Sequence, residues 1–393
     1  MADPWLTVIG MNEDGLDGLS TPARAALARA AVVFGGPRHL ELADVGARGQ
    51  AWPVPFSIAG VMARRGEAVV ILASGDPFWY GAGGSVVAHL ARGEWVSHPA
   101  PSTFSLAANG LGWPLESTVC LGLHAAEFDG VAPHLTRGAR VICLVRDGAA
   151  VGELAAWLCA QGAGLTRLHV MERLGGPRAR VRDVLAQAYD LPNVCAPVAV
   201  ALEVCGTVAR AVTPGLPDTA FAHDGQITKQ AMRALTICAL GPRRGELLWD
   251  IGAGSGSISV EWCLQAGRAV AMEGKPARAA NIAENIARFG LAQRMVLQVG
   301  RVDGSAWPEA DPNAVFIGGG ATDEVLSALW AQLPAGVRVV INGVTLETEV
   351  LLAQWQARKG GTLLRVELAQ AAALGTMRGW TPARPVVQWS VTT

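Results

Sequence analysis

The sequence of 393 residues contains few lysines, only two tyrosines and no closely spaced cysteine pair. Its seven cysteines never form Cys-x-x-Cys, so the sequence carries no zinc or redox motif and is typical of reduced thiols in a cytoplasm. A net charge of −1 argues against a nucleic-acid partner, which requires a strongly basic face. The apolar stretches are interrupted before a membrane span is complete, and the N-terminus shows no signal-peptide pattern. We therefore expect a cytoplasmic protein without metal, nucleic-acid or membrane partners.

Length and composition predict two globular domains. A hydrophobic content of 51% excludes a disordered chain, and the chain is too long for one ordinary core. Residues 206–222 carry Pro, Gly and Thr without periodicity and predict a linker between domains 1–205 and 223–393. Short apolar runs alternate with helical patterns in both domains, which indicates an α/β fold. The expected strands are 6–9, 31–34, 68–73, 141–145, 198–204, 247–250, 269–272, 295–298, 314–317 and 337–341.

The most informative segment joins an apolar strand to a glycine loop. The strand ends at Asp250, the loop reads Gly252-Ala253-Gly254-Ser255-Gly256, and a helical pattern covers 257–265. Glycines let backbone N–H groups approach a ligand, and the new helix offers its positive end. About 20 residues further on, a second strand ends at Glu273, where an acid grips a ribose hydroxyl in nucleotide-type sites.

Three cofactor classes compete for this loop. A hydride-transfer fingerprint requires a third glycine at the position of Ser259, and a P-loop requires a lysine that the segment lacks. The remaining class is the Gly-x-Gly-x-Gly loop of S-adenosylmethionine-dependent methyltransferases. A tight turn without ligand is the alternative, and Glu273 makes it the weaker one.

Further candidate cofactor contacts flank this loop. Thr228, at the start of the helical run 231–239, is either the N-cap of that helix or a residue that closes over the cofactor. Gly300, Arg301 and Val302 follow the strand 295–298, where adenine is expected to lie. The fourth strand ends in three glycines, not in the Asn/Asp-Pro-Pro-Tyr of base or glutamine methylases.

Four motifs of this half resemble the decarboxylating C15-methyltransferases of cobalamin biosynthesis; they lie at residues 225–229, 249–256, 316–319 and 342–347. The resemblance implies a Rossmann-like class I methyltransferase domain. It also implies a corrin-precursor substrate, methylated at C15 while the C12 acetate loses carbon dioxide. Arg301 and Val302 depart from the acidic and small residues usual in the family.

Decarboxylation needs an electron sink, which a conjugated macrocycle supplies, and then a proton donor. After His223 this half contains neither His nor Tyr, so the candidate donors are Lys229, Asp303, Glu347, His223 and water. Asn342 is a candidate for orienting a ring carboxylate. Glu347 is equally well explained as a helix N-terminal acid favoured by the dipole.

The first half carries different motifs, at residues 8–10, 34–40, 73–81 and 101–105. In this order they resemble the tetrapyrrole methylase family and its C5-methylating branch. The resemblance implies two α/β lobes with S-adenosylmethionine in the cleft between them and Gly10 along the tetrapyrrole trough. The implied cofactor contacts are Gly10, Ser74, Gly75, Asp76, Pro77, Ser102 and Thr103.

The first loop departs from the family's glycine-rich pattern because residues 12–14 include two acids. Asp14 either helps to deprotonate or orient the substrate or is a solvated loop acid. His39, beside Arg38, is a candidate contact for a carboxylate, although lone histidines are more often structural. Glu172 lies in a family-like segment without an assignable role.

Together, the two resemblances imply a fused enzyme that methylates precorrin-6B at C5 and C15 and removes the C12 acetate carboxyl, giving precorrin-8. The resemblance of the C-terminal half also implies a homo-oligomer, with a tetramer through that domain as one form. A Rossmann dehydrogenase, which binds NADH, and a non-enzymatic tetrapyrrole carrier are the rival hypotheses. Charge alone suggests contacts to ring carboxylates, with a solvated surface as the default, for Arg233, Arg301, Arg338 and Arg378.

Overall fold

Two units make up the chain, Met1–Arg210 and Ala211–Thr393. The computed structural model describes residues 4–124, 128–206, 208–300 and 307–393. The boundary between the units falls inside the segment 206–222. In the described part of the chain no helix combines the length and the apolar character needed to cross a membrane.

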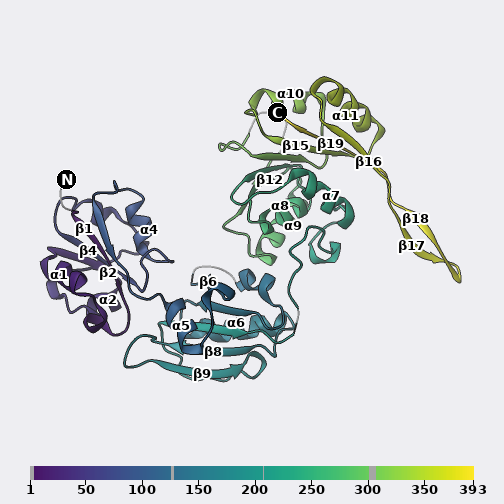
Figure 1. The fold of residues 1–393 in the computed structure, drawn as a ribbon. Helices are drawn as coiled ribbons and strands as arrows, with labels where there is room; N and C mark the ends of the chain where they lie inside the picture. The colour runs from purple at the N-terminus through teal and green to yellow at the C-terminus, as the bar shows by residue number, and fades with distance from the viewer. Residues whose placement is uncertain (1–3, 125–127, 207, 301–306) are drawn as a thin grey trace. The chain divides into compact units, whose positions relative to one another are not determined.

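The first unit opens with a parallel sheet of order β3-β2-β4-β1-β5 (Figure 1). Its strands are β1 (Leu6–Met11), β2 (Val32–Gly35), β3 (Gly49–Ala51), β4 (Val69–Ser74) and β5 (Trp95–His98). The accompanying helices are α1 (Thr21–Arg29), α2 (Pro37–Leu42), α3 (Ala59–Met62) and α4 (Ala82–Val87). Apolar side chains are buried on both faces of this sheet. Because β1 and β4 are parallel and in register, Met11 and Ser74 end side by side at one edge.

A second, mixed sheet completes the first unit in the order β6-β7-β10-β8-β9. β6 runs parallel to β7, and the remaining pairs are antiparallel. Its strands are β6 (Val119–Gly122), β7 (Arg140–Leu144), β8 (Arg167–Glu172), β9 (Arg180–Leu185) and β10 (Val198–Glu203). The helices are α5 (Thr103–Leu111), which Ser102 caps through its side chain, and α6 (Gly148–Ala160).

The second unit is a doubly wound sheet of order β13-β12-β11-β14-β15-β19-β16. Its first five strands are parallel, and β19 pairs antiparallel with both of its neighbours. The strands are β11 (Leu247–Ile251), β12 (Arg268–Glu273), β13 (Met295–Val299), β14 (Ala314–Ile317), β15 (Arg338–Gly343), β16 (Thr362–Val366) and β19 (Val386–Thr392). The helices are α7 (Gln230–Leu240), α8 (Ser257–Leu264), α9 (Pro276–Arg288), α10 (Asp323–Gln332) and α11 (Leu346–Lys359).

The order of this sheet reverses between β11 and β14, which is the switch point where ligands bind in doubly wound folds. The glycine loop follows β11, and Glu273 is the last residue of the adjacent strand β12, so both lie at the carboxyl edge of the sheet. Apolar clusters cover both faces of the sheet, and Trp249 and Trp389 are fully buried within one of them. A rigid, two-sided core therefore supports the loop.

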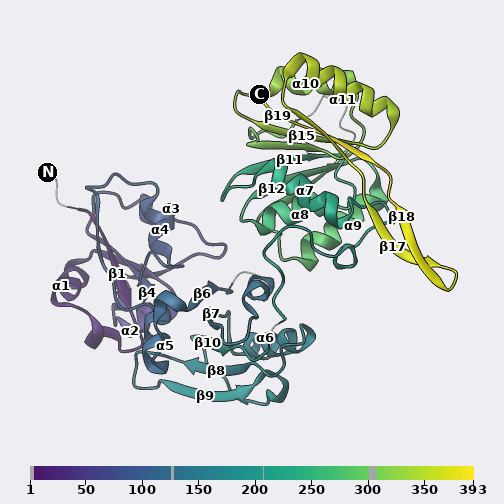
Figure 2. The same cartoon turned by 45° about the vertical axis from the view of Figure 1, so that its right-hand side comes forward.

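The ten strands expected from the sequence are all present, each within two residues of its expected bounds, and the predicted α/β class is confirmed. The sequence pattern missed the hairpin formed by β17 (Ala369–Leu374) and β18 (Met377–Pro382). This hairpin extends away from the second unit's sheet as a two-stranded arm (Figure 2). Its alanine-rich first strand gives no alternating apolar pattern, so its strand periodicity is weak.

Candidate active sites

The glycine loop of the second unit turns sharply between β11 and α8. Gly252, Gly254 and Gly256 all have φ between 61° and 71°, a left-handed conformation that only glycine adopts without strain. A Cβ on Gly252 would lie 2.8 Å from the carbonyl oxygen of Gly319. A Cβ on Gly254 would meet nothing within 4 Å, so the loop is open on that side. The first glycine therefore permits close packing, and the second leaves room for a ligand.

Glu273 closes the loop from the neighbouring strand. Its buried carboxylate accepts hydrogen bonds from the backbone N–H of Gly254 at 2.8 Å and of Lys275 at 2.8 Å, one on each oxygen. Each carboxylate oxygen retains a second lone pair, which a ribose hydroxyl can use. This geometry agrees with the role predicted for Glu273.

Asp250 lies buried at the end of β11. The backbone N–H and hydroxyl of Ser259 donate to its Oδ2 at 3.2 and 2.6 Å, while Oδ1 has no partner among the described residues. Burial raises the pKa of Asp250 to about 6, against the Ser259 hydrogen bonds that lower it. A buried oxygen without a donor costs about 1–3 kcal/mol, so a ligand donor here is stabilising. This orphaned oxygen and the open side of Gly254 fit the S-adenosylmethionine predicted for this loop.

The remaining loop positions are placed only in part. Ala253 and Ser255 lie within the turn, and Ala253 donates its N–H to the Met272 carbonyl oxygen at 3.0 Å. Gly300 follows β13 and donates its N–H to the Glu273 carbonyl oxygen at 3.1 Å, which holds it beside the loop. Arg301, Val302 and Asp303 lie outside the described residues, so their predicted roles stay predictions.

Helix α7 begins one residue later than a cap at Thr228 would require. The N-cap residue is Lys229, and no side chain caps the helix, so the prediction that Thr228 is the N-cap was wrong. The carbonyl oxygen of Thr228 instead accepts a hydrogen bond from Arg233. Lys229 is exposed, with its Nζ 3.6 Å from Asp218.

Asn342 lies inside the second unit, away from solvent. It donates to the Thr236 hydroxyl at 3.0 Å and accepts from the Gln388 amide at 2.9 Å, which makes a buried polar network. Glu347 is exposed in the first turn of α11, and its own backbone N–H and the Thr345 hydroxyl lower the pKa of its carboxyl. These positions favour a structural role for Asn342 and the helix-start alternative for Glu347.

Two arginines suggested as contacts for ring carboxylates are already engaged. Arg233 is fully buried and pairs with Glu261 and Asp218, so it is neither solvated nor available to a ligand. Arg338 bridges to Glu246 and donates to the Leu240 carbonyl oxygen at 2.7 Å. The suggested role was wrong for both, because each compensates a carboxylate of this chain. Arg378 is exposed on β18.

The first unit holds a cavity of about 500 Å³ between its two sheets. Ser74, Asp76, Ser102 and Thr103 line this cavity, and their predicted contact with a cofactor stays a prediction. The opposite wall comes from the second sheet and the segments that follow its strands. A cavity of this size accepts a small-molecule ligand, so the two-lobed cleft fits the cofactor expected there.

Gly10, Gly75 and Pro77 support this wall without lining it. A Cβ on Gly10 would lie 1.9 Å from the Gly75 carbonyl oxygen and 2.5 Å from the Ala100 nitrogen. Gly75 has φ +55°, and its Cβ would lie 2.8 Å from the Ser102 Cα. Gly10 therefore has no space for a side chain, because its α-carbon packs directly against neighbouring backbone, and its place along the trough stays a prediction.

The two acids after β1 have different environments. Asp14 is exposed at the start of a short 3-10 helix, and partial burial raises the pKa of its carboxyl. Glu13 is buried and forms an ion pair with Arg38. Glu13, one of the two acids noted in this loop, lines the cavity, whereas the exposed position of Asp14 favours the alternative of a loop acid.

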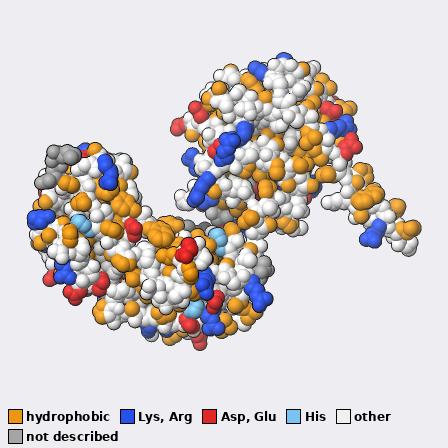
Figure 3. Space-filling view, viewed as in Figure 1, with side chains coloured by type: hydrophobic (Ala, Val, Ile, Leu, Met, Phe, Trp, Pro, Cys, Tyr) orange, Lys and Arg blue, Asp and Glu red, His pale blue; other side chains and the backbone are white. Residues whose placement is uncertain are grey.

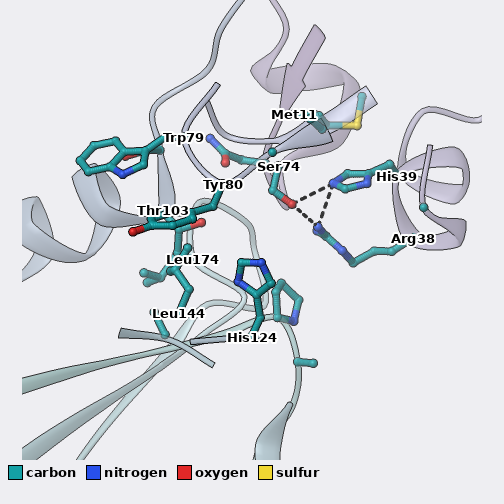
Figure 4. Close-up of a pocket in the computed structure, with 18 of the residues that line it drawn as sticks. Met11, Arg38, His39, Ser74, Trp79, Tyr80, Thr103, His124, Leu144 and Leu174 are labelled. Carbon is teal, nitrogen blue, oxygen red and sulfur yellow. Dashed lines mark hydrogen bonds between the residues drawn. The ribbon is translucent and has the colours of Figure 1, made fainter. Parts of the chain in front are cut away.

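Arg38, His39 and Ser74 converge at the cavity wall (Figure 4). Arg38 Nη2 lies 2.8 Å from Ser74 Oγ and 2.9 Å from His39 Nε2, and His39 Nε2 lies 3.0 Å from Ser74 Oγ. Burial, reinforced by the Arg38 charge, lowers the pKa of His39 to about 4. His39 is therefore neutral near pH 7. A neutral His39 is a weaker partner for a carboxylate than the sequence suggested, and the neighbouring Arg38 is already paired with Glu13.

Aromatic side chains form another part of the wall. Trp79 and Tyr80 follow the Ser74–Pro77 turn and both pack against Phe104. The ring centroid of Phe104 lies 4.7 Å from that of Trp79 and 6.0 Å from that of Tyr80. Tyr80 adopts φ +60°, which places its ring near His124 across the cavity. Flat apolar rings of this kind suit a planar macrocycle.

Glu172, which had no assignable role, is structural. Its buried carboxylate accepts from Arg180 and from the Cys195 N–H, both at 2.7 Å, and from Arg182 at 3.1 Å. This ion pair network ties β8 to β9 and to the segment before β10.

The described residues contain no group of three or more His, Cys, Asp or Glu able to hold a metal ion.

Comparison with known proteins identifies a family for each unit. Residues 6–189 match the model of the tetrapyrrole (corrin/porphyrin) methylases, and residues 219–393 match the precorrin methyltransferase domain. The fold and sites thus define a two-unit methyltransferase. A precorrin-6Y C(5,15)-methyltransferase [decarboxylating] from Sinorhizobium sp is 44% identical over all of this chain and 97% of its own. The chain therefore belongs to the family of decarboxylating precorrin-6Y C(5,15)-methyltransferases.

A second curated protein and a solved structure are also similar to this chain. The protein of the same name from Mycobacterium tuberculosis is 38% identical over 98% of this chain and 99% of its own. The crystal structure of the C-terminal domain of the Rhodobacter capsulatus precorrin-6Y C5,15-methyltransferase is 54% identical. It covers 47% of this chain and 100% of its own, with a TM-score of 0.46.

Proposed function

We propose that the chain methylates precorrin-6B at C5 and C15 and removes the C12 acetate carboxyl as carbon dioxide, yielding precorrin-8 in the cobalamin pathway. The glycine loop with Glu273 and the unpaired oxygen of Asp250 carries this proposal, because together they fit S-adenosylmethionine. Relatives that span both units and bear the corresponding name support the substrate.

We divide the reactions between the units. The cavity of the first unit serves C5 methylation, and the carboxyl edge of the second unit's sheet serves C15 methylation and decarboxylation. Each unit then binds its own S-adenosylmethionine, which supplies an electrophilic methyl group on a sulfonium. The residues of the chain contribute mainly position, because methyl transfer depends on the alignment of carbon and methyl.

In the second unit, Glu273 holds a ribose, and the loop backbone carries the remainder of the cofactor. Lys229 and Asp303 remain the predicted proton donors after decarboxylation. Lys229 has an exposed ammonium at the start of α7, which can donate a proton. Glu347 is less suited, because its lowered pKa keeps it ionised.

A homo-oligomer built through the second unit, with a tetramer as one form, belongs to the same proposal. On the β17–β18 arm, Leu374, Met377 and Trp380 are 69%, 76% and 77% exposed. Figure 3 shows hydrophobic side chains gathered along this arm. An isolated two-stranded hairpin is marginal in water, so a second copy that covers the arm would stabilise it.

We also propose a cytoplasmic location. The structure describes all seven cysteines, and each is a free thiol, which suits a reducing compartment.

The test is mass spectrometry of precorrin-6B after incubation of the full chain with S-adenosylmethionine. The proposal predicts a product with two added methyl groups and one lost carbon dioxide. An unchanged macrocycle, in a protein that binds S-adenosylmethionine, would refute the assigned substrate.

A further inference from the structure

The side chains of Glu13, Arg38, His39 and Ser74 form a connected cluster at the end of β1 and β4. Arg38 and His39 come from α2, which packs against this edge of the sheet. Ser74 is exposed to the cavity, and Glu13 is buried behind the cluster. The proposed methylation at C5 leaves Arg38 and His39 without a role in cofactor binding.

The hydrogen bonds fix the protonation of the histidine. A guanidinium can only donate, so the His39 Nε2 beside Arg38 presents its lone pair and the ring proton lies on Nδ1. Arg38 also donates to Ser74 Oγ, so the Ser74 hydroxyl proton is free to point to His39 Nε2, whose one lone pair is shared between Arg38 and Ser74. The hydrogen bonds thus run from Arg38 to Ser74 and from Ser74 to His39, and the neutral imidazole of His39 can accept a proton.

Methylation of a ring carbon releases one proton. The ring π electrons form the new C–C bond, the S–CH3 bond breaks, and its electron pair leaves with the neutral thioether. The positive charge moves from sulfur to the ring, and loss of the proton from the methylated carbon cancels it. Such a cation is a strong acid, so a weak base such as a neutral imidazole can take its proton, provided that the base is held in position for the transfer.

The other acceptors of the cavity are less suitable. Glu13 is paired with Arg38, and Asp76 accepts the Phe78 N–H at 2.9 Å. Charged and titratable groups surround His39 from three places. Helix α2 itself carries Arg38 and Glu41, and the segment after β1 carries Glu13, Asp14 and Asp17. The cavity wall adds Asp76, His124 and Arg146, whereas β2, β3 and β4 carry no such group. Of these, His124 projects from the second lobe, and its ring centroid lies 6.1 Å from that of Tyr80 (Figure 4).

We propose that Ser74 and His39 form a proton relay for the methylation in the first unit. The Ser74 hydroxyl takes the proton from the methylated carbon and passes its own proton to His39 Nε2. Glu13 and Arg38 are positioning residues: Glu13 holds the guanidinium, and the guanidinium directs the hydroxyl proton toward the histidine. The paired carboxylate also compensates the transient imidazolium. The relay rests on the proposed function.

The experiment measures methyl transfer to C5 by the full chain in single turnover. It uses S-adenosylmethionine with a 13C methyl group and precorrin-6B carrying either hydrogen or deuterium at C5. NMR of the product distinguishes C5 from C15. His39→Gln is compared with His89→Gln, a change at an exposed histidine outside the cavity.

For His39→Gln the relay predicts transfer slower by about a hundredfold or more, with unchanged S-adenosylmethionine binding. Proton loss then limits the rate, so a deuterium isotope effect appears that wild type lacks, and added imidazole restores part of the rate. Ser74→Ala, which keeps the histidine, is expected to slow transfer in the same way.

Wild-type transfer by His39→Gln would overturn the relay. A slow His39→Gln without isotope effect and without imidazole rescue would also overturn it, because a structural role predicts that result. Absence of C5 label in the wild-type product would instead refute the proposed function of the first unit.

Discussion

Replacement of Arg233 by methionine is expected to destabilise the second unit strongly. The Arg233 side chain is fully buried and donates to Glu261 Oε1 at 2.6 Å, to Asp218 Oδ1 at 3.1 Å, and to the carbonyl oxygens of Leu216 and Thr228. These bonds hold the segment before α7 against α8. Methionine fills much of the volume but supplies no donor.

The magnitude follows from the carboxylate left behind. Glu261 is also buried, and without Arg233 it keeps only the N–H groups of Gly215 and Leu216, at 2.6 and 2.9 Å. Removing one partner of a buried ion pair costs about 3–5 kcal/mol. Two carbonyl oxygens also lose their donor. We therefore expect a loss in this range.

Hydrogen exchange with mass spectrometry measures this loss for each unit separately. Peptides from β11 and α8 report the second unit, and peptides from β7 and β10 provide an internal reference in the first. The expected loss corresponds to about a hundredfold to few-thousandfold faster exchange in β11. The control, Arg358→Met, removes an exposed pair with Asp323 and should cost at most about 1 kcal/mol.

A loss below about 1 kcal/mol for Arg233→Met would refute the reasoning. It would mean that Glu261 is adequately solvated or paired without the guanidinium. Equal acceleration in β7 and β10 would likewise show that the effect is not confined to the second unit.

Two further predictions concern the second unit. Burial raises the folded-state pKa of Asp250 from 3.8 to about 6, so the free energy of unfolding should fall as pH rises between these values. The variant Asp250→Asn should lack this fall in urea unfolding, and a variant with the same pH profile as wild type would contradict the prediction. Trp380→Lys should shift the protein to a smaller species in analytical ultracentrifugation, because a charge replaces an exposed apolar side chain on the arm. Lys359→Ala, on α11, is the control. An unchanged sedimentation coefficient for Trp380→Lys would argue against the arm as the contact between copies.

The glycine loop of the second unit was predictable because its requirements are local. The glycines at 252, 254 and 256 are needed for positive φ angles within one turn, and the sequence spacing alone places Glu273 on the adjacent strand. The central strands are apolar runs bounded by polar or glycine residues, so their bounds were also predictable.

The missed features depend on residues far apart in the chain. Ser74 lies 36 residues from Arg38, and Gln388 lies 46 residues from Asn342, so no local pattern indicates that they bond. Arg233 reads as a surface arginine until Glu261, 28 residues away on α8, is placed beside it. Such partners follow from tertiary packing, which periodicity does not encode.

The central claim is that each unit carries its own methylation site and that only the second decarboxylates. Its most direct test is mass spectrometry of precorrin-6B after reaction with the full-length Gly254→Arg variant, which strains the loop at φ +61° and fills its open side. Gly336→Arg is the control, with φ +89° and no neighbour within 4 Å, and should give wild-type product. For Gly254→Arg the account predicts one added methyl and a retained carboxyl. Loss of both methylations in a folded variant, or continued release of carbon dioxide, would contradict it.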